Sequence, residues 1–512
     1  MIKKQKIYIL EQLSKWLGIL LMIAIPLEIL MFPSLPNLFG CLMTLLSYLI
    51  FRYFLKQKYI LRSPFAFFMY LSMFMYRYLP LLATLTEGNP ISVGFERPYE
   101  TFIYESLVFI LSSLAYYLVC NPKQRVKNST LQKLLFKFDF FKIKVQTIWF
   151  LGFIGFAVRL YTFSTGGAEY GDVGGKFLDG VKYLLYAPMV LLFLDLTGLP
   201  KYRKTNKVWI YLTIVFLINI ASNSRAAMIT PIAIFGLLFF LHAVKNNIQI
   251  KEIISPRKFF ILMLFLVFGL NMLSDLSYAM LYTRGGRSSV SKVELFQQTI
   301  ATYQNKSLMQ KIKTDRSKKT RSVENYTQGW TEAYIDNFML NRYANLRITD
   351  ETIYHADRRG YGDPVMQEHF WIQLILILPN PVLKFLNINY NKNDYRFSRG
   401  DLLSGGSLGS LVVTSHVGDG LATFGYWYFP FQFILNICVF FLLNTFLYFK
   451  GKKVIYSAFG LMNVFVFLGM FRNANGMIVD LGYCIRRYWQ GIITYLIVLT
   501  IVGLIQKVLF KK

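Results

Sequence analysis

A histidine and an aspartate stand close together in the glycine-containing stretch 415–420, as His416 and Asp419. Residues three apart lie on one face of a helix, so these two side chains can face one another on a first helical turn. An imidazole or a carboxylate there could accept a proton from a hydroxyl group. The alternative interpretation is that Asp419 caps the helix and His416 is incidental.

Arginines form a second set of candidate functional residues. Arg225 follows Ser224 in a link of a few residues between two apolar runs, next to the start of the second run, where helical N–H groups favour anions. A guanidinium group binds phosphate oxygens through a planar fork. The candidates for binding a lipid-linked diphosphate are Arg225, Arg284, Arg287 and Arg472. Anchoring to lipid headgroups is the alternative, and it explains Arg486 and Arg487 well.

Motifs for metals, nucleotides and disulfides are missing from the sequence. It contains no H-x-x-x-H, no D-x-D, no Walker A motif and no G-x-G-x-x-G. The four cysteines each lie in or beside an apolar run and are interpreted as small hydrophobic residues. We therefore expect a site without metal or cofactor.

The composition shows where these residues must be positioned. Of the 512 residues, 54% are hydrophobic and only 16% are charged, which excludes a soluble globular or disordered protein. A membrane helix needs about 20 mostly apolar residues. We predict an all-α, polytopic integral membrane protein with about twelve transmembrane helices. The predicted spans are Trp16–Phe32, Asn37–Leu55, Pro64–Leu85, Glu100–Cys120, Val145–Ser164, Gly180–Gly198, Val208–Ser222, Ala226–Val244, Phe259–Tyr282, Leu421–Phe449, Val454–Phe471 and Tyr488–Gln506.

Lysine and arginine in the loops predict the orientation. With the N-terminus inside, the inner segments carry 29 Lys and Arg but only three acidic residues, Glu11, Asp139 and Glu252. This asymmetry accounts for most of the net charge of +29, so we expect contact with membrane lipid and no binding to nucleic acid. Both termini are predicted to be cytoplasmic.

The chain divides into three predicted parts. Residues 1–280 hold the first nine spans, 281–420 form one large extracytoplasmic loop, and 421–512 hold the last three spans. Within the loop, the basic stretch Lys306–Arg321 is expected to be mobile. The apolar stretch Phe370–Leu378 is too short to span and is expected to lie at the interface or to pack on the bundle.

Several charged residues fall inside predicted spans, which is rare because charges in the hydrocarbon are costly, and six of them are considered as candidates. Asp195 lies near the inner end of its span, whereas the other five lie in the outer halves. These five are predicted to line one cavity open to the outer side: Glu28, Arg77, Glu105, Arg159 and Asp275. Snorkelling or structural ion pairs, such as Arg77 or Arg159 with Glu28 or Glu105, are the alternative.

The stretch Ser415–Trp427, with its glycine-rich turn followed by Phe-Gly-Tyr entering a span, resembles the oligosaccharide repeat unit polymerases, or Wzy-type O-antigen and capsule polymerases. The Ser224-Arg225-Ala226 turn is similar to a Ser-Arg element of that family. In Leu376–Pro381, Asn380 stands where the family often has an arginine. The resemblance covers mainly residues 205–490.

The resemblance implies a reaction at the outer face of the bacterial cytoplasmic membrane. A glycan on undecaprenyl diphosphate is transferred to the terminal sugar of another lipid-linked repeat unit, without metal or nucleotide. Arg225 would bind the diphosphate, with Arg284, Arg287 and Arg472 as candidates to join it, and His416 or Asp419 would be the base. A polysaccharide chain-length regulator is a candidate partner.

Two other functions stay open at this stage. A polysaccharide flippase or other transporter often has two matched halves, but here only the second half carries a long loop. An O-antigen-type ligase of the same fold family would differ from a polymerase only in its acceptor.

Overall fold

The computed structural model describes residues 8–123, 127–165, 173–199, 202–221, 224–249, 256–283, 292–322, 325–388, 390–392, 394, 395, 397–451, 453–471 and 476–509. Regular structure within these ranges is helical apart from one antiparallel hairpin, β1 (Leu447–Lys450) with β2 (Lys453–Tyr456). The all-α prediction is therefore confirmed for the described residues.

Within these described ranges, eight helical segments are long and apolar enough to cross a membrane. They are α1 (Ile9–Met31), α2 (Leu35–Phe54), α4 (Pro64–Thr86), α5 (Pro98–Cys120), α7 (Val145–Thr165), α11 (Arg225–Lys245), the segment of α21 (His416–Phe424), η3 (Gly425–Trp427), α22 (Tyr428–Leu443) and η4 (Asn444–Phe446), and the segment of α25 (Met477–Gly482), η5 (Tyr483–Arg487) and α26 (Tyr488–Leu509). These segments indicate a multi-pass membrane protein. The predicted seventh span overlaps α10 (Thr205–Ala221) and the ninth lies within α13 (Pro256–Tyr282), and neither helix is among these eight segments.

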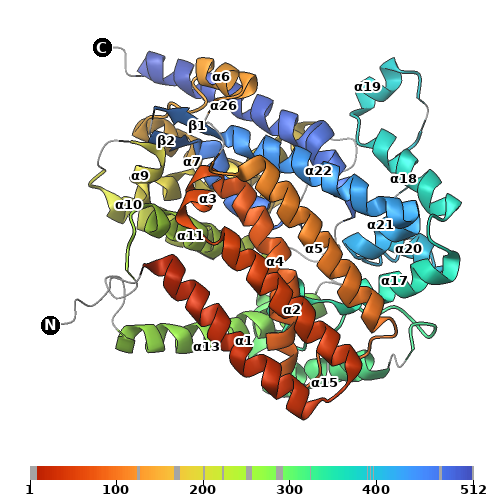
Figure 1. The fold of residues 1–512 in the computed structure, drawn as a ribbon. Coiled ribbons are helices and arrows are strands. Elements are labelled where there is room, and N and C mark those ends of the chain that lie inside the picture. The colour runs from red at the N-terminus through yellow and green to blue at the C-terminus, as the bar shows by residue number, and fades with distance from the viewer. Residues whose placement is uncertain are drawn as a thin grey trace.

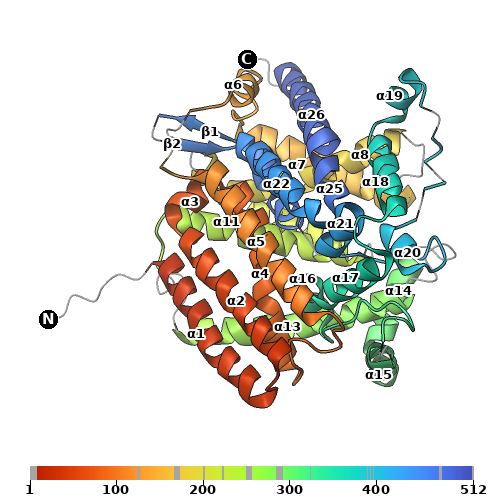
Figure 2. The same cartoon turned by 45° about the vertical axis from the view of Figure 1, so that its right-hand side comes forward.

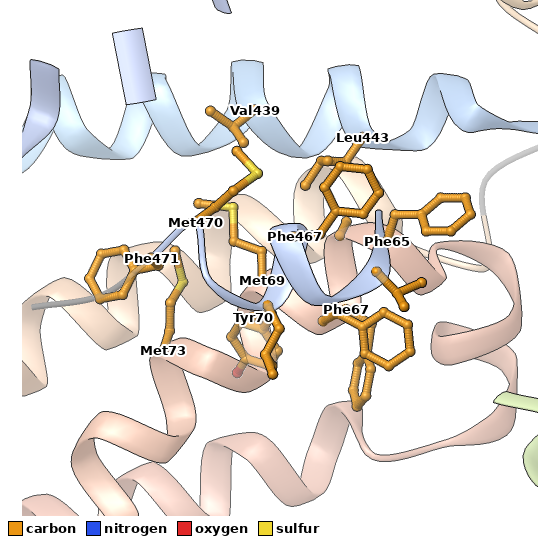
Figure 3. Packing of buried hydrophobic residues seen from close by; sticks show 14 of the residues in the cluster. Phe65, Phe67, Met69, Tyr70, Met73, Val439, Leu443, Phe467, Met470 and Phe471 are labelled. Carbon is orange, nitrogen blue, oxygen red and sulfur yellow. The ribbon is translucent and has the colours of Figure 1, made fainter. Parts of the chain in front are cut away.

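Helix α4 lies at the centre of the molecule. Its sequence is apolar on all sides apart from Arg77 and a few hydroxyl groups, as expected for a helix that other helices enclose. Phe65 of α4 packs against Phe467 and lies beside Leu443 of α22, whereas Met73 of α4 lies beside Phe471, as Figure 3 shows. The neighbours α2, α5, α22 and α24 (Val464–Leu468) surround it.

Two predicted spans do not form single long helices, which corrects the sequence prediction there. Gly180–Gly198 contains the end of α8 (Val173–Val181), the 3-10 helix η1 (Lys182–Leu192), with Pro188 inside it, and the short α9 (Leu194–Thr197). Val454–Phe471 contains most of β2, then α23 (Ala458–Met462) and α24, separated at Asn463. The count of twelve spans therefore stays a prediction.

Protein side chains enclose the broken segment η1 in the core. A Cβ atom on Gly155 would collide with the backbone of Leu184 and Leu185, so glycine lets α7 touch η1 directly. The hydroxyl of Tyr211 donates to the carbonyl of Leu185 at 3.0 Å. Irregular backbone at membrane depth is tolerated where protein surrounds it or where it lines a cavity.

The segment predicted as one long loop folds into short helices. They are α14 (Lys292–Gln304), α15 (Lys306–Ser322), α16 (Phe338–Ala344), α17 (Arg347–Arg359), α18 (Pro364–Leu376), α19 (Asn380–Phe385) and α20 (Arg399–Ser404). The stretch expected to be mobile thus forms the helix α15. Helix α17 packs on α5 and α21, and α18 packs on α21 and α25.

The segments assigned to the two sides of the membrane lie at different ends of the molecule. Figures 1 and 2 place β1, β2 and α6 (Thr130–Lys137) at one end, and α15 and α17 toward the other. Gln132 of α6 donates to the carbonyl of Leu447 at 2.7 Å, and Tyr456 donates to Leu61 of α3 (Gln57–Arg62) at 2.8 Å. The predicted inner segments around Gln132 and Leu61 therefore both contact the hairpin of β1 and β2, whose turn was also predicted to be inside.

Candidate functional site

His416 begins α21 and is fully buried. The hydroxyl of Ser415 accepts the N–H of Gly418 at 2.9 Å, a side-chain cap that starts the helix at His416. Nδ1 of His416 shares a hydrogen bond with the Tyr428 hydroxyl at 2.8 Å, and Nε2 lies 3.3 Å from Oδ2 of Asp480 on α25. The ring is thus held at both nitrogens, with one side toward Asp480.

Asp419 has a different partner. Its Oδ1 accepts Nε of the buried Arg399 at 2.5 Å, and Arg399 also donates to the Thr423 hydroxyl and to the Met366 carbonyl. A Cβ atom at Gly476 would collide with the other oxygen, Oδ2. Asp419 is therefore enclosed by structural contacts, and the structure does not bring its side chain to His416. The cap of α21 comes from Ser415, not from Asp419.

A cavity of 790 Å³ adjoins Asp480. Most of its wall is apolar and includes Ile229, Phe459, Phe465, Phe467 and Met470. The broken segments η1, α23 and α24 supply part of this wall, a place where irregular backbone is tolerated. Pockets of this volume hold ligands of drug size or larger.

Polar groups stand on the same wall. Arg342 of α16 and Arg487 of η5 line the cavity, and both side chains are exposed. Among the described residues, no carboxylate forms a salt bridge with either guanidinium group. The hydroxyls of Tyr183 and Tyr483 also line it and are buried without a hydrogen-bond partner in the described part of the chain. Asp480 is the acidic residue on this wall.

The predicted diphosphate-binding arginines relate to this cavity through their neighbours in sequence. Ser224 and Ala226, on either side of Arg225, line it, and Ser224 caps α11 by accepting the N–H of Ala227. Arg225 is the first residue of α11, but its side chain lies outside the described residues. Arg284, Arg287 and Arg472 lie wholly outside them.

The five charges predicted to share a cavity do not line one together. Arg77 and Glu105 form a fully buried ion pair at 2.6 Å, and Oε1 of Glu28 accepts the N–H of Ile91 at 2.8 Å. Nε of Arg159 donates to Asn219 at 3.1 Å. None of the five lines the 790 Å³ cavity. Buried charges in an apolar bundle are satisfied locally, so equal depth in the membrane did not imply a shared site.

The fifth residue of this set, Asp275, belongs to a second, polar pocket. Asp275 pairs with Lys313 of α15 at 2.5 Å. With Glu87, Asn271 and Asn337 it lines a pocket of 440 Å³. The carboxylate of Glu87 accepts the N–H groups of Asp336 and Asn337 there, so this pocket ties the loop to the end of α4.

One member of the five does reach the neighbourhood of His416. The Arg77 guanidinium lies 5.5 Å from the centre of the Phe471 ring, and that ring stacks on His416 at 5.0 Å. The Thr349 hydroxyl of α17 donates to Glu105 at 2.9 Å. The Arg77–Glu105 pair therefore links the core helices α4 and α5 to the helix that covers them.

Helix α17 is anchored by buried carboxylates. Asp350 accepts hydrogen bonds from the N–H groups of Glu96 and Arg97 and from two hydroxyls, those of Thr101 and Tyr326. Burial raises the pKa of Asp350 to about 6 despite these bonds. Burial also raises the pKa of Glu351, whose carboxylate accepts the N–H of Thr331, to about 9.

The two loop histidines are poor candidates for charged groups. Burial, aided by the nearby Arg358 and Arg359, lowers the pKa of His355 to about 4. Burial and the nearby Arg399 lower the pKa of His369 to about 4 as well. Both rings are therefore neutral at physiological pH, and both pack against aromatic side chains.

Sequence analysis alone did not identify four residues of this site. Asp480 interrupts an apolar run, the same signal that identified Glu28 or Glu105, but the predicted span began only at Tyr488, whereas α25 begins at Met477. Arg342 and Arg399 lie in a loop rich in basic residues, where no local pattern singles them out. Tyr428 is one of several aromatics after Phe424.

Comparison with protein-family models, curated proteins and solved structures finds no match to this chain.

Proposed function

We propose that this protein polymerises undecaprenyl-diphosphate-linked oligosaccharide repeat units into a surface polysaccharide, such as an O-antigen, a capsule or an exopolysaccharide. The reaction takes place at the outer face of the bacterial cytoplasmic membrane. The observation that carries the proposal is the composition of the 790 Å³ cavity: an apolar wall, two arginines without a carboxylate partner among the described residues, and one carboxylate backed by a histidine.

The ligand that suits such a wall is an amphipathic anion. An isoprenoid chain would lie against Phe459, Phe465 and Met470, because burying apolar surface is favourable. A diphosphate would be bound by Arg342 and Arg487, since guanidinium groups pair with phosphate oxygens in a fork. Arg225 begins the helix whose first turn borders the same cavity, where N–H groups favour an anion.

Asp480 replaces Asp419 as the proposed carboxylate of the site. In the proposed reaction, a hydroxyl of the acceptor sugar attacks the anomeric carbon of the donor, and the bond from that carbon to the diphosphate oxygen breaks. The hydroxyl proton passes to the Asp480–His416 pair, and undecaprenyl diphosphate leaves with the bonding electrons. Tyr428 fixes the orientation of the His416 ring from its other nitrogen. Arginines stabilise the negative charge on the leaving group.

A strain that lacks this gene tests the proposal against its two rivals. Loss of a polymerase leaves single repeat units on the outer surface, loss of a flippase leaves none there, and loss of a ligase leaves finished polymer on its lipid carrier. Gel analysis of surface glycans from the deletion strain and from strains carrying Arg487→Gln or Arg342→Gln separates these outcomes. Polymer of normal length from both variants at normal protein level would contradict the site.

The orientation needs its own test, because the proposal places the reaction outside. Cysteines introduced at Lys133 and Asn325 would be labelled with a membrane-impermeant maleimide in intact cells. The charge pattern predicts that the cysteine at position 133 is protected and the one at 325 is labelled. The reverse result would contradict both the orientation and the proposed location of the reaction.

A further inference from the structure

Helices α18 and α19 form a hairpin with an unusually apolar exposed surface. Phe385 of α19 is 86% exposed, and Trp371 of α18 is 53% exposed. Val382 and Leu386 extend the same surface. Exposed apolar surface of this extent outside a membrane is unfavourable and marks a binding surface.

The polar groups where α18 ends are satisfied by cationic side chains. Nη1 of Arg486 donates to the carbonyl of Ile377 at 3.0 Å, and Nζ of Lys392 donates to the carbonyl of Leu378 at 2.7 Å. The last carbonyls of a helix have no partner within the helix, and in an exposed loop water satisfies them. In a bilayer no water is present, so the protein must supply the donors.

The hairpin adjoins a surface that faces lipid. Helix α18 packs against α25, and the Ile377 side chain lies next to Gly482 at the start of the membrane segment 477–509. Figure 2 shows α18 next to α25, which leads into α26, and α18 and α19 apart from the loop helix α15. Helix α26 exposes Trp489, Ile493 and Ile497 along its length. The apolar surface of the hairpin is thus a continuation of the lipid-facing surface of α26.

We propose that the α18–α19 hairpin inserts into the membrane leaflet on the side where the long segment 281–420 lies. Phe385 would lie among the acyl chains and Trp371 nearer the headgroups. The partner is the lipid bilayer itself. Arg486 is the anchor that ties the hairpin to the start of α26. This inference concerns membrane contact alone, so it stands whether or not the proposed reaction is correct.

Spin labels on the purified full-length chain test this directly. In a background with Cys438→Ser and Cys484→Ser, a nitroxide would be placed at Phe385→Cys, with Ile493→Cys as the lipid-facing control and Ser407→Cys as the water-facing control. The protein would be reconstituted in nanodiscs of phosphatidylethanolamine and phosphatidylglycerol. We expect the label at 385 to favour collision with oxygen over a water-soluble nickel complex, as at 493 and opposite to 407.

Arg486 and its neighbour Arg487 provide a matched pair of variants that tests the anchoring role of Arg486. Arg486→Gln removes the donor to Ile377, so nickel accessibility at 385 should rise several-fold. Arg487→Gln changes a side chain on the cavity wall and should leave the depth at 385 unchanged. Two results would overturn the inference: nickel accessibility at 385 equal to that at 407, or exclusion of both reagents, which would mean that protein covers the hairpin.

Discussion

Nε2 of His416 lies 3.3 Å from Oδ2 of Asp480, and both side chains are almost completely buried. The two residues are far apart in the sequence and come from different membrane segments, α21 and α25. Gln432 of α22 also donates to Asp480 Oδ2 at 3.2 Å. A carboxylate held by two donors at the edge of an apolar cavity is a costly arrangement to maintain, and such costs are typical of functional sites.

Asp480→Asn tests whether this carboxylate takes the proton in the proposed reaction. The amide keeps the shape of the side chain but cannot accept a proton, so polymer formation should fall by at least about 100-fold, the contribution typical of a general base. The measurement is the length distribution of surface polymer at matched protein level. Asp480→Glu should retain part of the activity.

Asp419→Asn is the matched control. It removes the charge that pairs with the buried Arg399, and breaking a buried pair costs about 3–5 kcal/mol. Its defect should therefore appear as a lower thermal midpoint in detergent and less protein in the membrane. If Asp419→Asn folded normally and lost polymer while Asp480→Asn kept it, the roles of the two carboxylates would be exchanged.

Arg225→Ala should abolish polymer while leaving the protein in the membrane. Charge-assisted hydrogen bonds contribute roughly 1.5–3 kcal/mol each, so the loss of one or two weakens diphosphate binding by at least about tenfold. Arg225→Lys should also be impaired, because a single ammonium group cannot replace the fork. Full activity of the lysine variant would favour anchoring to headgroups instead.

The Arg77–Glu105 pair should contribute to folding and not to the reaction. Replacing one partner, as in Arg77→Met or Glu105→Gln, leaves the other charge buried and unpaired, at a cost of about 3–5 kcal/mol. Removing both charges together, in Arg77→Met with Glu105→Met, should recover much of that loss. Thermal midpoints of the purified variants would check this, and additive losses in the double variant would contradict coupling between the two residues.

Composition predicted the long apolar helices, both those at the surface and the enclosed helix α4. Runs such as Pro64–Leu85 and Glu100–Cys120 needed no tertiary information, because a bilayer demands long apolar helices wherever they occur. The segments 180–198 and 454–471 were apolar for another reason, since they line the interior of the protein. Hydropathy does not distinguish a helix in lipid from a broken segment in a protein core.

The candidate site was only partly predictable. His416 was found because a titratable residue stands in a glycine-containing stretch just before an apolar run, but the cap was assigned to Asp419 and not to Ser415. The contact of His416 with Asp480 depends on how α21 meets α25, which local spacing does not encode. The same holds for Arg399, whose partner Asp419 lies in another helix. Glu28, Arg159 and Asp275 were predicted to lie at a similar depth in the membrane. Each of them contacts a different neighbour, so similar depth did not predict a shared cavity.

The buried carboxyl of Glu351 predicts a dependence of stability on pH. Burial raises the pKa of this group from 4.5 to about 9, so the folded protein keeps a proton that the unfolded chain releases. Stability from this group is fully present below pH about 4.5 and is lost as the pH rises through about 9, at no more than about 1.4 kcal/mol per pH unit. We expect the thermal midpoint of the purified protein to decrease as the pH is raised from 5 to 9.

Glu351→Gln, which keeps an acceptor for Thr331, should flatten that decrease, and Glu368→Gln at an exposed position should not. Equal slopes in all three proteins would mean that Glu351 is ionised in the folded state.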